Sequence, residues 1–190
     1  MKKRIAIFAS GSGTNAEEIF KKFQNHPTAD VTVLLSNNAN AYALIRAEKF
    51  EVATKVFDRK TFRESNEIVD FLLNKRIDLI VLAGFMWLVP INLVSAFPNR
   101  IINIHPALLP KYGGKGMYGM HVHQAVKDNN ESETGITIHY VNDKYDEGQI
   151  IYQVSCPISN SDTPDDIANK VHLLEYEHYP RIIEELISKL

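Results

Sequence analysis

Short apolar runs alternate with amphipathic segments through the first half of the chain. A continuous apolar run bounded by turn residues indicates a strand buried on both faces, whereas apolar residues spaced three and four apart indicate a helix packed on a sheet. Strand–helix–strand order with such strands predicts a mainly parallel sheet covered on both faces. The expected strands are Ile5–Ala9, Val31–Leu35, Ala53–Val56, Asp78–Ala83 and Ile101–His105, and the expected helices are Asn15–Phe23, Tyr42–Lys49 and Phe62–Asn74.

The C-terminal part of the chain follows a different pattern. Thr134–Val141 alternates between two sets of side chains, and Gln149–Val154 is a second predicted strand, expected to pair antiparallel around the Asn142–Gly148 turn. A long helix follows Thr163, a capping residue before a proline and two aspartates, and Pro180 is expected to kink or restart it. The whole pattern predicts an α/β fold: a Rossmann-like, doubly wound, mainly parallel sheet with a C-terminal antiparallel strand region and a long C-terminal helix.

Composition narrows the class of protein. The 190 residues suffice for one domain with a sizeable core, so residues 1–190 are expected to form a single domain. A formal net charge of -2 gives no basic field for nucleic acid or anionic membranes. The only cysteine, Cys156, excludes an internal disulfide and a cysteine metal cluster. The apolar stretch at the start is too short for a signal peptide, and no run could span a membrane, so a cytoplasmic soluble protein is expected.

The first candidate for chemistry lies where the predicted strand Ile101–His105 ends. Asn103 and His105 are two residues apart, which places both side chains on one face of a strand. An amide donor beside an imidazole suits the stabilisation of an oxygen that becomes negative during a reaction at a carbonyl. Pro106 and Pro110 then open the chain into a loop, and ligands of open α/β sheets bind at such strand ends. The alternative is a buried histidine and asparagine that bond only to neighbouring backbone.

The second candidate is the glycine-rich turn after the first strand. Gly11–Ala16 has the form G-x-G-x-x-A, in which glycines admit a ligand close to the backbone and the following helix start offers N–H groups to an anion. A dinucleotide site also needs an acidic residue after the second strand, where this chain has Ser36-Asn37-Asn38. A single phosphate, with Thr14 and Asn15 as side-chain donors, therefore fits better. The alternative is a tight turn that binds no ligand.

The Asn142–Gly148 turn carries three carboxylates, which most simply face water. If this turn packs against the end of the His105 strand, one carboxylate can pair with the imidazole, favour its protonated form and relay a proton. His121 and His123 form an H-x-H pair without a third ligand at a suitable spacing, so no metal site is expected.

Taken together, these motifs resemble the folate-dependent formyltransferase family, and in particular its glycinamide ribonucleotide branch. The resemblance covers essentially the whole chain. The Asn-x-His-Pro-Ala-Leu-Leu-Pro block with a later Asp-x-Gly is specific for the formyltransferase fold, and the N-terminal loop with the short length indicates the branch. The matching segments are Ser10–Asn15, Leu82–Met86, Asn103–Tyr112 and Tyr145–Gly148.

The resemblance implies a reaction and a role for each matching residue. A formyl group would pass from 10-formyltetrahydrofolate, as co-substrate and without a metal, to the primary amine of glycinamide ribonucleotide in de novo purine biosynthesis. Asn103 and His105 would stabilise the oxyanion, while Asp146 would keep His105 protonated and move the proton. A phosphate-binding half at about 1–100 and a catalytic and folate half at about 101–190 are expected. Ribonucleotide contacts would come from Ser12, Gly13, Thr14, Asn15, Arg59 and Glu175, and folate contacts from Met86, Trp87, Leu88, Val89, Asn103, Asn142, Asp143, Lys144 and Tyr145.

The chemistry agrees with this interpretation, because an amine can attack a formyl group without a metal or a covalent nucleophile. It requires that both substrates be held together, and that oxyanion donors and a proton acceptor be present. Two departures from the family stand out: Trp87 occupies a position that is often arginine, and the glycine-rich loop Gly113–Met120 is longer than usual. The alternatives are another formyltransferase-fold enzyme, such as a formyl-folate hydrolase or one with a different acceptor, and a non-catalytic phosphate-binding module. A monomer or a homodimer is expected.

Overall fold

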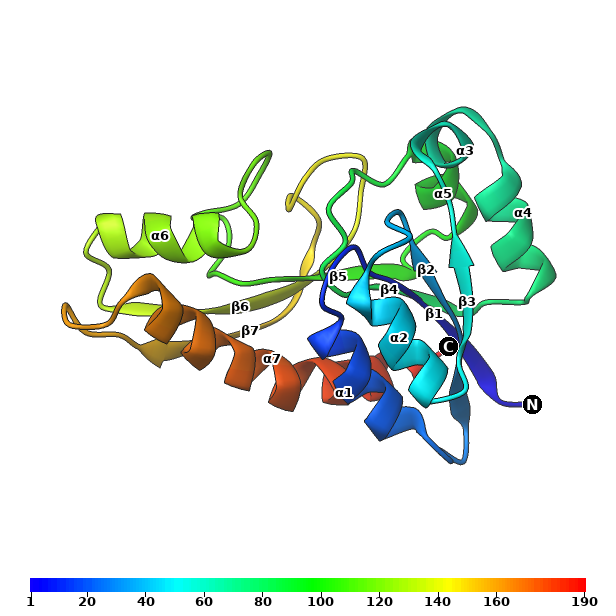
Figure 1. The fold of residues 1–190 in the computed structure, drawn as a ribbon, viewed down its shortest axis with the longest axis horizontal. Helices are drawn as coiled ribbons and strands as arrows, with labels where there is room; N and C mark the ends of the chain where they lie inside the picture. Colours follow the sequence, from blue (N-terminus) through cyan, green and yellow to red (C-terminus); the bar gives the residue numbers. More distant parts are fainter.

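Seven strands form one sheet in the order β3-β2-β1-β4-β5-β6-β7, in a computed structural model that describes residues 1–190 (Figure 1). The first five strands in this order are parallel, and β6 and β7 are antiparallel to their neighbours. The predicted mainly parallel sheet with an antiparallel C-terminal pair is confirmed. The strands are β1 (Lys3–Phe8), β2 (Ala29–Ser36), β3 (Ala53–Val56), β4 (Leu79–Leu82), β5 (Ile101–His105), β6 (Glu133–Tyr140) and β7 (Ile150–Pro157).

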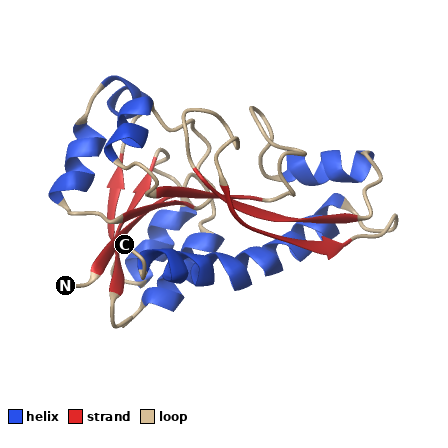
Figure 2. Ribbon diagram, turned by 180° about the vertical axis from the view of Figure 1, so that it is seen from behind, coloured by secondary structure: helices blue, strands red, loops and turns tan.

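Helices cover both faces of the sheet, as the buried strands require. One apolar cluster joins one face to α1 (Thr14–Phe23), α2 (Tyr42–Lys49) and α7 (Pro164–Ile187). A second cluster joins the other face to α3 (Arg59–Glu64), α4 (Glu67–Asn74) and α5 (Ile91–Ala96). Figure 2 shows these helices above and below the strands, with α6 (Met120–Asp128) beside the long β6–β7 pair. None of the helices combines the length and the apolar character needed to cross a membrane.

The prediction of one helix over Phe62–Asn74 is wrong, because the segment divides into α3 and α4. Asp58 caps α3 by accepting a hydrogen bond from Thr61 N at 2.7 Å, so this helix starts before the apolar pattern does. Ser65 then has extended backbone angles, and its hydroxyl bonds to Thr61 O and to Glu67 N. Such local side-chain bonds compete with helix continuation and end α3 here.

Two further details of the helices differ from the sequence prediction. The six-residue helix α5 was not predicted, because fewer than two turns are too short to show a periodic pattern. Pro180 does not restart α7, which continues from Pro164 to Ile187. A proline inside a helix costs about 3 kcal/mol. Burial of Tyr179, Ile182 and Ile183 around it against the sheet offsets that loss.

Tyr179 attaches α7 to the two strands that carry the site. Its side chain is fully buried, and the hydroxyl donates to Leu82 O at 2.9 Å and lies 3.4 Å from Ile102 O. Burial raises the pKa of Tyr179 well above its usual range, so this hydroxyl remains a donor. Leu82 is the last residue of β4, and Ile102 lies within β5 directly before Asn103.

Replacing Tyr179 by phenylalanine is expected to lower the free energy of unfolding by about 1–3 kcal/mol, because it removes a buried hydroxyl that donates to the Leu82 carbonyl. Urea denaturation followed by circular dichroism measures the change. Tyr176→Phe is the matched control on the same helix, since the Tyr176 hydroxyl has no hydrogen-bond partner. Equal transition midpoints for the two variants would contradict the structural role of the Tyr179 hydroxyl.

Candidate active site

The carboxyl ends of β1, β4 and β5 meet at one edge of the sheet and enclose a cavity of about 690 Å³. The strand order reverses between β1 and β4, because β2 and β3 lie on one side of this pair and β5 on the other. Ligands of open α/β sheets bind at such a switch point, and the volume is that of a small-molecule site. The wall includes Ser10–Asn15, Leu82–Val89 and Asn103–Pro106.

Asn103 is oriented by a histidine on the neighbouring strand. Asn103 pairs with His139 across β5 and β6. The Nδ1–H of His139 donates to Tyr140 O at 2.9 Å, so in the neutral ring Nε2 accepts a hydrogen bond from Asn103 Nδ2 at 3.1 Å. In the protonated ring Nε2 carries a hydrogen and faces Asp146 Oδ1 at 3.6 Å. The other hydrogen of Nδ2 lies toward Asp146 Oδ1 at 3.5 Å, the long limit of a hydrogen bond. This second N–H is therefore available to a stronger acceptor.

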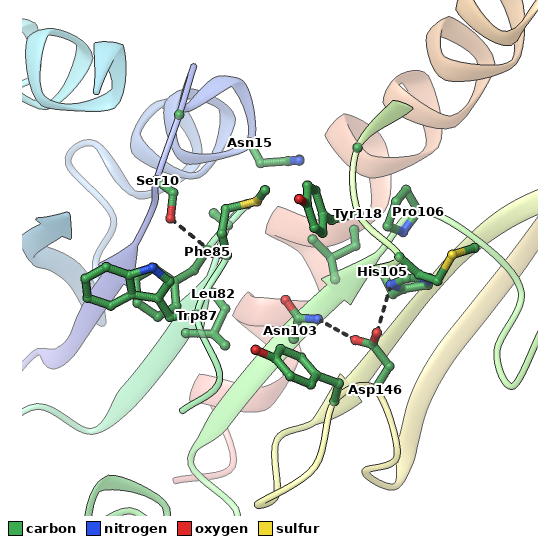
Figure 3. A pocket seen from close by; sticks show the side chains of 18 of the residues that line it. Ser10, Asn15, Leu82, Phe85, Trp87, Asn103, His105, Pro106, Tyr118 and Asp146 are labelled. Carbon is green, nitrogen blue, oxygen red and sulfur yellow. Dashed lines mark hydrogen bonds and ion pairs between the residues drawn. The ribbon is translucent and has the colours of Figure 1, made fainter. Parts of the chain in front are cut away.

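His105 has one nitrogen fixed and one free to titrate. Its ring is buried, and Nε2 bonds to Tyr112 O at 2.8 Å; because a carbonyl only accepts, Nε2 carries a hydrogen. Nδ1 lies 3.5 Å from Asp146 Oδ2, and Figure 3 shows the carboxylate between His105 and Asn103. The titratable proton of His105 is therefore the one on Nδ1, which faces the Asp146 carboxylate.

Asp146 favours the protonated form of His105, as expected, but burial of the ring opposes this effect. Burial lowers the pKa of His105, and the nearby Asp146 only partly offsets that effect. Burial also tends to raise the pKa of Asp146, but bonds and charges from His139, His105 and Gly114 N outweigh it and lower that pKa. At neutral pH the pair is thus a carboxylate beside a neutral imidazole, with room for one proton.

Of the three carboxylates in the Asn142–Gly148 turn, only Asp146 faces the cavity. Asp146 has a positive φ of 56°, lines the cavity, and accepts a hydrogen bond from Gly114 N through Oδ2 at 3.0 Å. Asp143 and Glu147 are exposed. Glu147 pairs with Lys144 at 3.1 Å.

The glycine-rich turn leads directly into α1. Gly13 has a φ of 72°, and a Cβ there would lie 2.5 Å from the Cβ of Ala43, so both backbone angle and space require glycine. No side chain caps the start of α1, which leaves its first N–H groups for a ligand. Ser10 Oγ accepts a hydrogen bond from Met86 N at 3.0 Å and joins this turn to the segment after β4 (Figure 3).

Asn15 does not offer its amide donor to the cavity as expected. Its Nδ2 donates to Glu175 Oε2 at 2.9 Å, while its Oδ1 is buried without a partner. The buried Glu175 also bonds to His172 Nδ1 at 2.9 Å, and this contact raises the pKa of His172. The ring of His123 from α6 lies 6.5 Å from that of His172, and burial lowers the pKa of His123 to about 4.

The structure brings most of the predicted site residues to the cavity wall. Arg59, Asn142 and Asp143 are not among the lining residues, and the Arg59 guanidinium instead lies over the Trp87 ring at 5.8 Å. Sequence reasoning missed His139 and His172 and considered His123 only as a metal ligand, although all three line the cavity. The alternation of Thr134–Val141 already placed His139 on one defined face. No cluster of three or more His, Cys, Asp or Glu side chains is placed to hold a metal ion. The predicted residues on the wall are Ser12, Gly13, Thr14, Asn15, Met86, Trp87, Leu88, Val89, Asn103, His105, Lys144, Tyr145, Asp146 and Glu175.

A doubly wound sheet whose switch-point cavity combines a glycine-rich turn, an Asn-x-His strand end and a buried aspartate defines a Rossmann-like α/β protein of the formyltransferase type. The sequence profile of the formyl transferase family matches residues 3–183. The chain belongs to this family.

Known relatives agree with this assignment over nearly the whole chain. A chloroplastic phosphoribosylglycinamide formyltransferase from Arabidopsis thaliana is 37% identical over 188 residues, which cover 96% of this chain and 64% of that protein, slightly less than two thirds of its length. Phosphoribosylglycinamide formyltransferase of Haemophilus influenzae is 36% identical over 96% of this chain and 86% of that protein. The crystal structure of phosphoribosylglycinamide formyltransferase from Bacillus halodurans superposes with a TM-score of 0.88 at 38% identity, covering 98% of this chain and 96% of that one.

Proposed function

We propose that this protein transfers a formyl group from 10-formyltetrahydrofolate to the primary amine of glycinamide ribonucleotide, both small-molecule substrates. The observation that carries the proposal is the Asn103–His105–Asp146 cluster, which shares one cavity with an uncapped glycine-rich helix start. The names of the relatives, phosphoribosylglycinamide formyltransferases, support the choice of acceptor.

The two substrates would occupy opposite ends of the cavity. The ribonucleotide phosphate binds at Ser12–Asn15, and Glu175 accepts hydrogen bonds from the sugar hydroxyls. The folate lies along Met86–Val89, with the Asn142–Tyr145 backbone at its edge. Residues 1–100 thus supply the phosphate site, and residues 101–190 the catalytic groups and part of the folate site. Placing the amine and the formyl carbon together contributes several kcal/mol to the rate.

Formyl transfer then requires one proton to move from the attacking amine to the His105–Asp146 pair and from the pair to N10. The amine nitrogen attacks the formyl carbon, and the carbonyl electron pair moves to the oxygen. This oxyanion accepts a hydrogen bond from the free N–H of Asn103. The attacking nitrogen loses a proton to the His105–Asp146 pair, and the imidazolium that forms adds positive charge beside the oxyanion. The carbon–N10 bond then breaks, its electron pair stays on N10, and N10 takes the proton back from the pair. The carbonyl re-forms on the product amide, and the pair regains its starting protonation.

A spectrophotometric assay tests the proposal with purified protein, 10-formyltetrahydrofolate and glycinamide ribonucleotide, in the presence of a chelator. Loss of the formyl group that depends on the ribonucleotide is the expected result. Loss without any amine would identify a formyl-folate hydrolase, and consumption with only another amine would identify a different acceptor. No consumption with any acceptor would leave a binding protein and overturn the proposal.

A further inference from the structure

The glycine-rich segment between β5 and α6 has no role in the mechanism above, yet it forms part of the cavity wall. This glycine flap, residues Gly113–Gly119, contributes every residue from Gly114 to Gly119 to the lining. Gly114 and Gly116 have φ angles of 97° and 91°, and nothing lies within 4 Å of a Cβ at either position. Glycine is thus needed here for the backbone conformation and not for packing. The side chains between the glycines, those of Lys115, Met117 and Tyr118, belong to residues that line the cavity.

The two ends of the glycine flap are fastened to different parts of the site. At the first end, Tyr112 O bonds to His105 Nε2 at 2.8 Å, and Gly114 N donates to Asp146 Oδ2 at 3.0 Å. At the other end the chain enters α6, whose His123 lies beside His172.

His172 in turn bonds to Glu175, and Glu175 bonds to Asn15 at the start of α1. The flap therefore lines the same cavity as the glycine-rich turn and starts at the catalytic pair. Figure 3 shows the Tyr118 side chain of the flap directed into this space between Asn15 and Pro106.

Lys115 is the unpaired cation of the cavity. Two lysines and no arginine line the wall, and Lys144 is paired with Glu147 at 3.1 Å, whereas the Lys115 ammonium has no partner. Arg46 contacts the glycine-rich turn, but its guanidinium already donates to Ser12 O at 2.9 Å and is paired with Glu17. A phosphate at this turn meets backbone N–H groups but no free positive side chain from the turn itself.

We propose that Lys115 binds the phosphate monoester of the ribonucleotide and supplies the charge that the glycine-rich turn lacks. The identity of the ligand, the ribonucleotide, rests on the proposed function. The presence of an anion site at Lys115 rests on the structure. An ammonium–phosphate hydrogen bond is charge-assisted and stronger than a neutral one. Because Gly114 and Tyr112 contact Asp146 and His105, a phosphate held by Lys115 also keeps the flap ordered over the catalytic pair.

The test replaces Lys115 by methionine, which keeps much of the length and removes the charge. The KM for the ribonucleotide is expected to rise by roughly tenfold or more, with the KM for the formyl folate nearly unchanged. The same substitution has no such effect on the dephosphorylated riboside as acceptor, because the partner of Lys115 is then absent. Lys115→Arg restores most of the affinity. Lys60→Met is the matched control, since Lys60 is exposed on α3 and outside the cavity.

Two results would overturn the inference: a raised KM for the folate alone, which would assign Lys115 to the folate carboxylates, or equal losses with ribonucleotide and riboside. Thermal unfolding of Lys115→Met is expected to match wild type, because Lys115 has no partner within the protein. Calorimetric titration of the full chain with ribose 5-phosphate needs no turnover. If the protein does not transfer formyl groups, the proposed function is refuted. Weaker binding of ribose 5-phosphate to Lys115→Met than to wild type would still support the phosphate site.

Discussion

Replacing Asp146 by asparagine is expected to lower kcat for formyl transfer by about 10²- to 10⁴-fold, the usual range for loss of a proton-transferring group. Asparagine keeps the volume of the side chain, and its amide oxygen can still accept the hydrogen bond from Gly114 N. The substitution removes the charge that lies 3.5 Å from Nδ1 of His105. Steady-state kinetics with both substrates varied gives the effect, and KM values are expected to stay close to wild type because neither substrate loses a binding contact.

The pH dependence of kcat in the same variant gives a second readout. In the wild type, burial lowers the pKa of His105 and the charge of Asp146 raises it in part. The rate is expected to fall at acidic pH, where the pair already holds the proton that it must accept. Without Asp146 the pKa of His105 falls further, so the acidic limb of the profile moves to lower pH.

Glu147→Gln is the matched control, because Glu147 is the exposed carboxylate next to Asp146 in the same turn. Its kcat and acidic limb are expected to match wild type. A comparable loss in both variants would indicate that the turn, and not the charge beside His105, supports turnover. An unshifted acidic limb in Asp146→Asn would show that the His105–Asp146 pair does not control the rate.

The sequence predicts the parts of this site that local periodicity controls. The spacing of Asn103 and His105 on a strand fixes a common face whatever the rest of the fold does, and the structure places both on the cavity wall. Continuous apolar runs separated by helices likewise specify a parallel sheet, and a parallel sheet brings strand ends to one edge. The glycine-rich turn therefore meets the Asn-x-His strand end for topological reasons.

Other parts of the site depend on register and packing, which no local pattern contains. His139 reaches Asn103 only because β6 pairs with β5 in one particular register. His123 and His172 meet because α6 packs against α7. The protonation of His105 is a competition between burial and a nearby charge, and only the folded chain shows that burial is the larger effect.

The division of Phe62–Asn74 has a similar cause at a smaller scale. The apolar positions of this segment fit one continuous helix, but Asp58 and Ser65 bond to nearby backbone and set separate ends. Such side-chain bonds offer the backbone an alternative to helix continuation, which the apolar pattern does not reveal. The error does not affect the site, because α3 and α4 lie on the sheet face that packs the second apolar cluster.

Replacing Asn103 by alanine is expected to lower kcat by about 10²- to 10³-fold, equivalent to about 2.7–4 kcal/mol of lost oxyanion stabilisation. The amide orientation is set by His139, whose Nε2 takes one hydrogen at 3.1 Å and leaves the other to the developing oxyanion. Because this bond forms fully only in the transition state, kcat and kcat/KM are expected to fall together. Steady-state kinetics under the conditions used for Asp146→Asn measures both quantities.

Asn92→Ala separates this effect from a general loss of structure. Asn92 bonds to Ser65 O and Asn66 Oδ1 on the opposite side of the sheet from α7, so its removal affects stability without touching the cavity. Its kcat is expected to remain at the wild-type value even if the free energy of unfolding falls. If Asn103→Ala keeps wild-type kcat, the oxyanion donor lies elsewhere on the wall. His105 would then be the remaining donor, because its Nδ1 gains a hydrogen when it accepts the proton of the attacking amine.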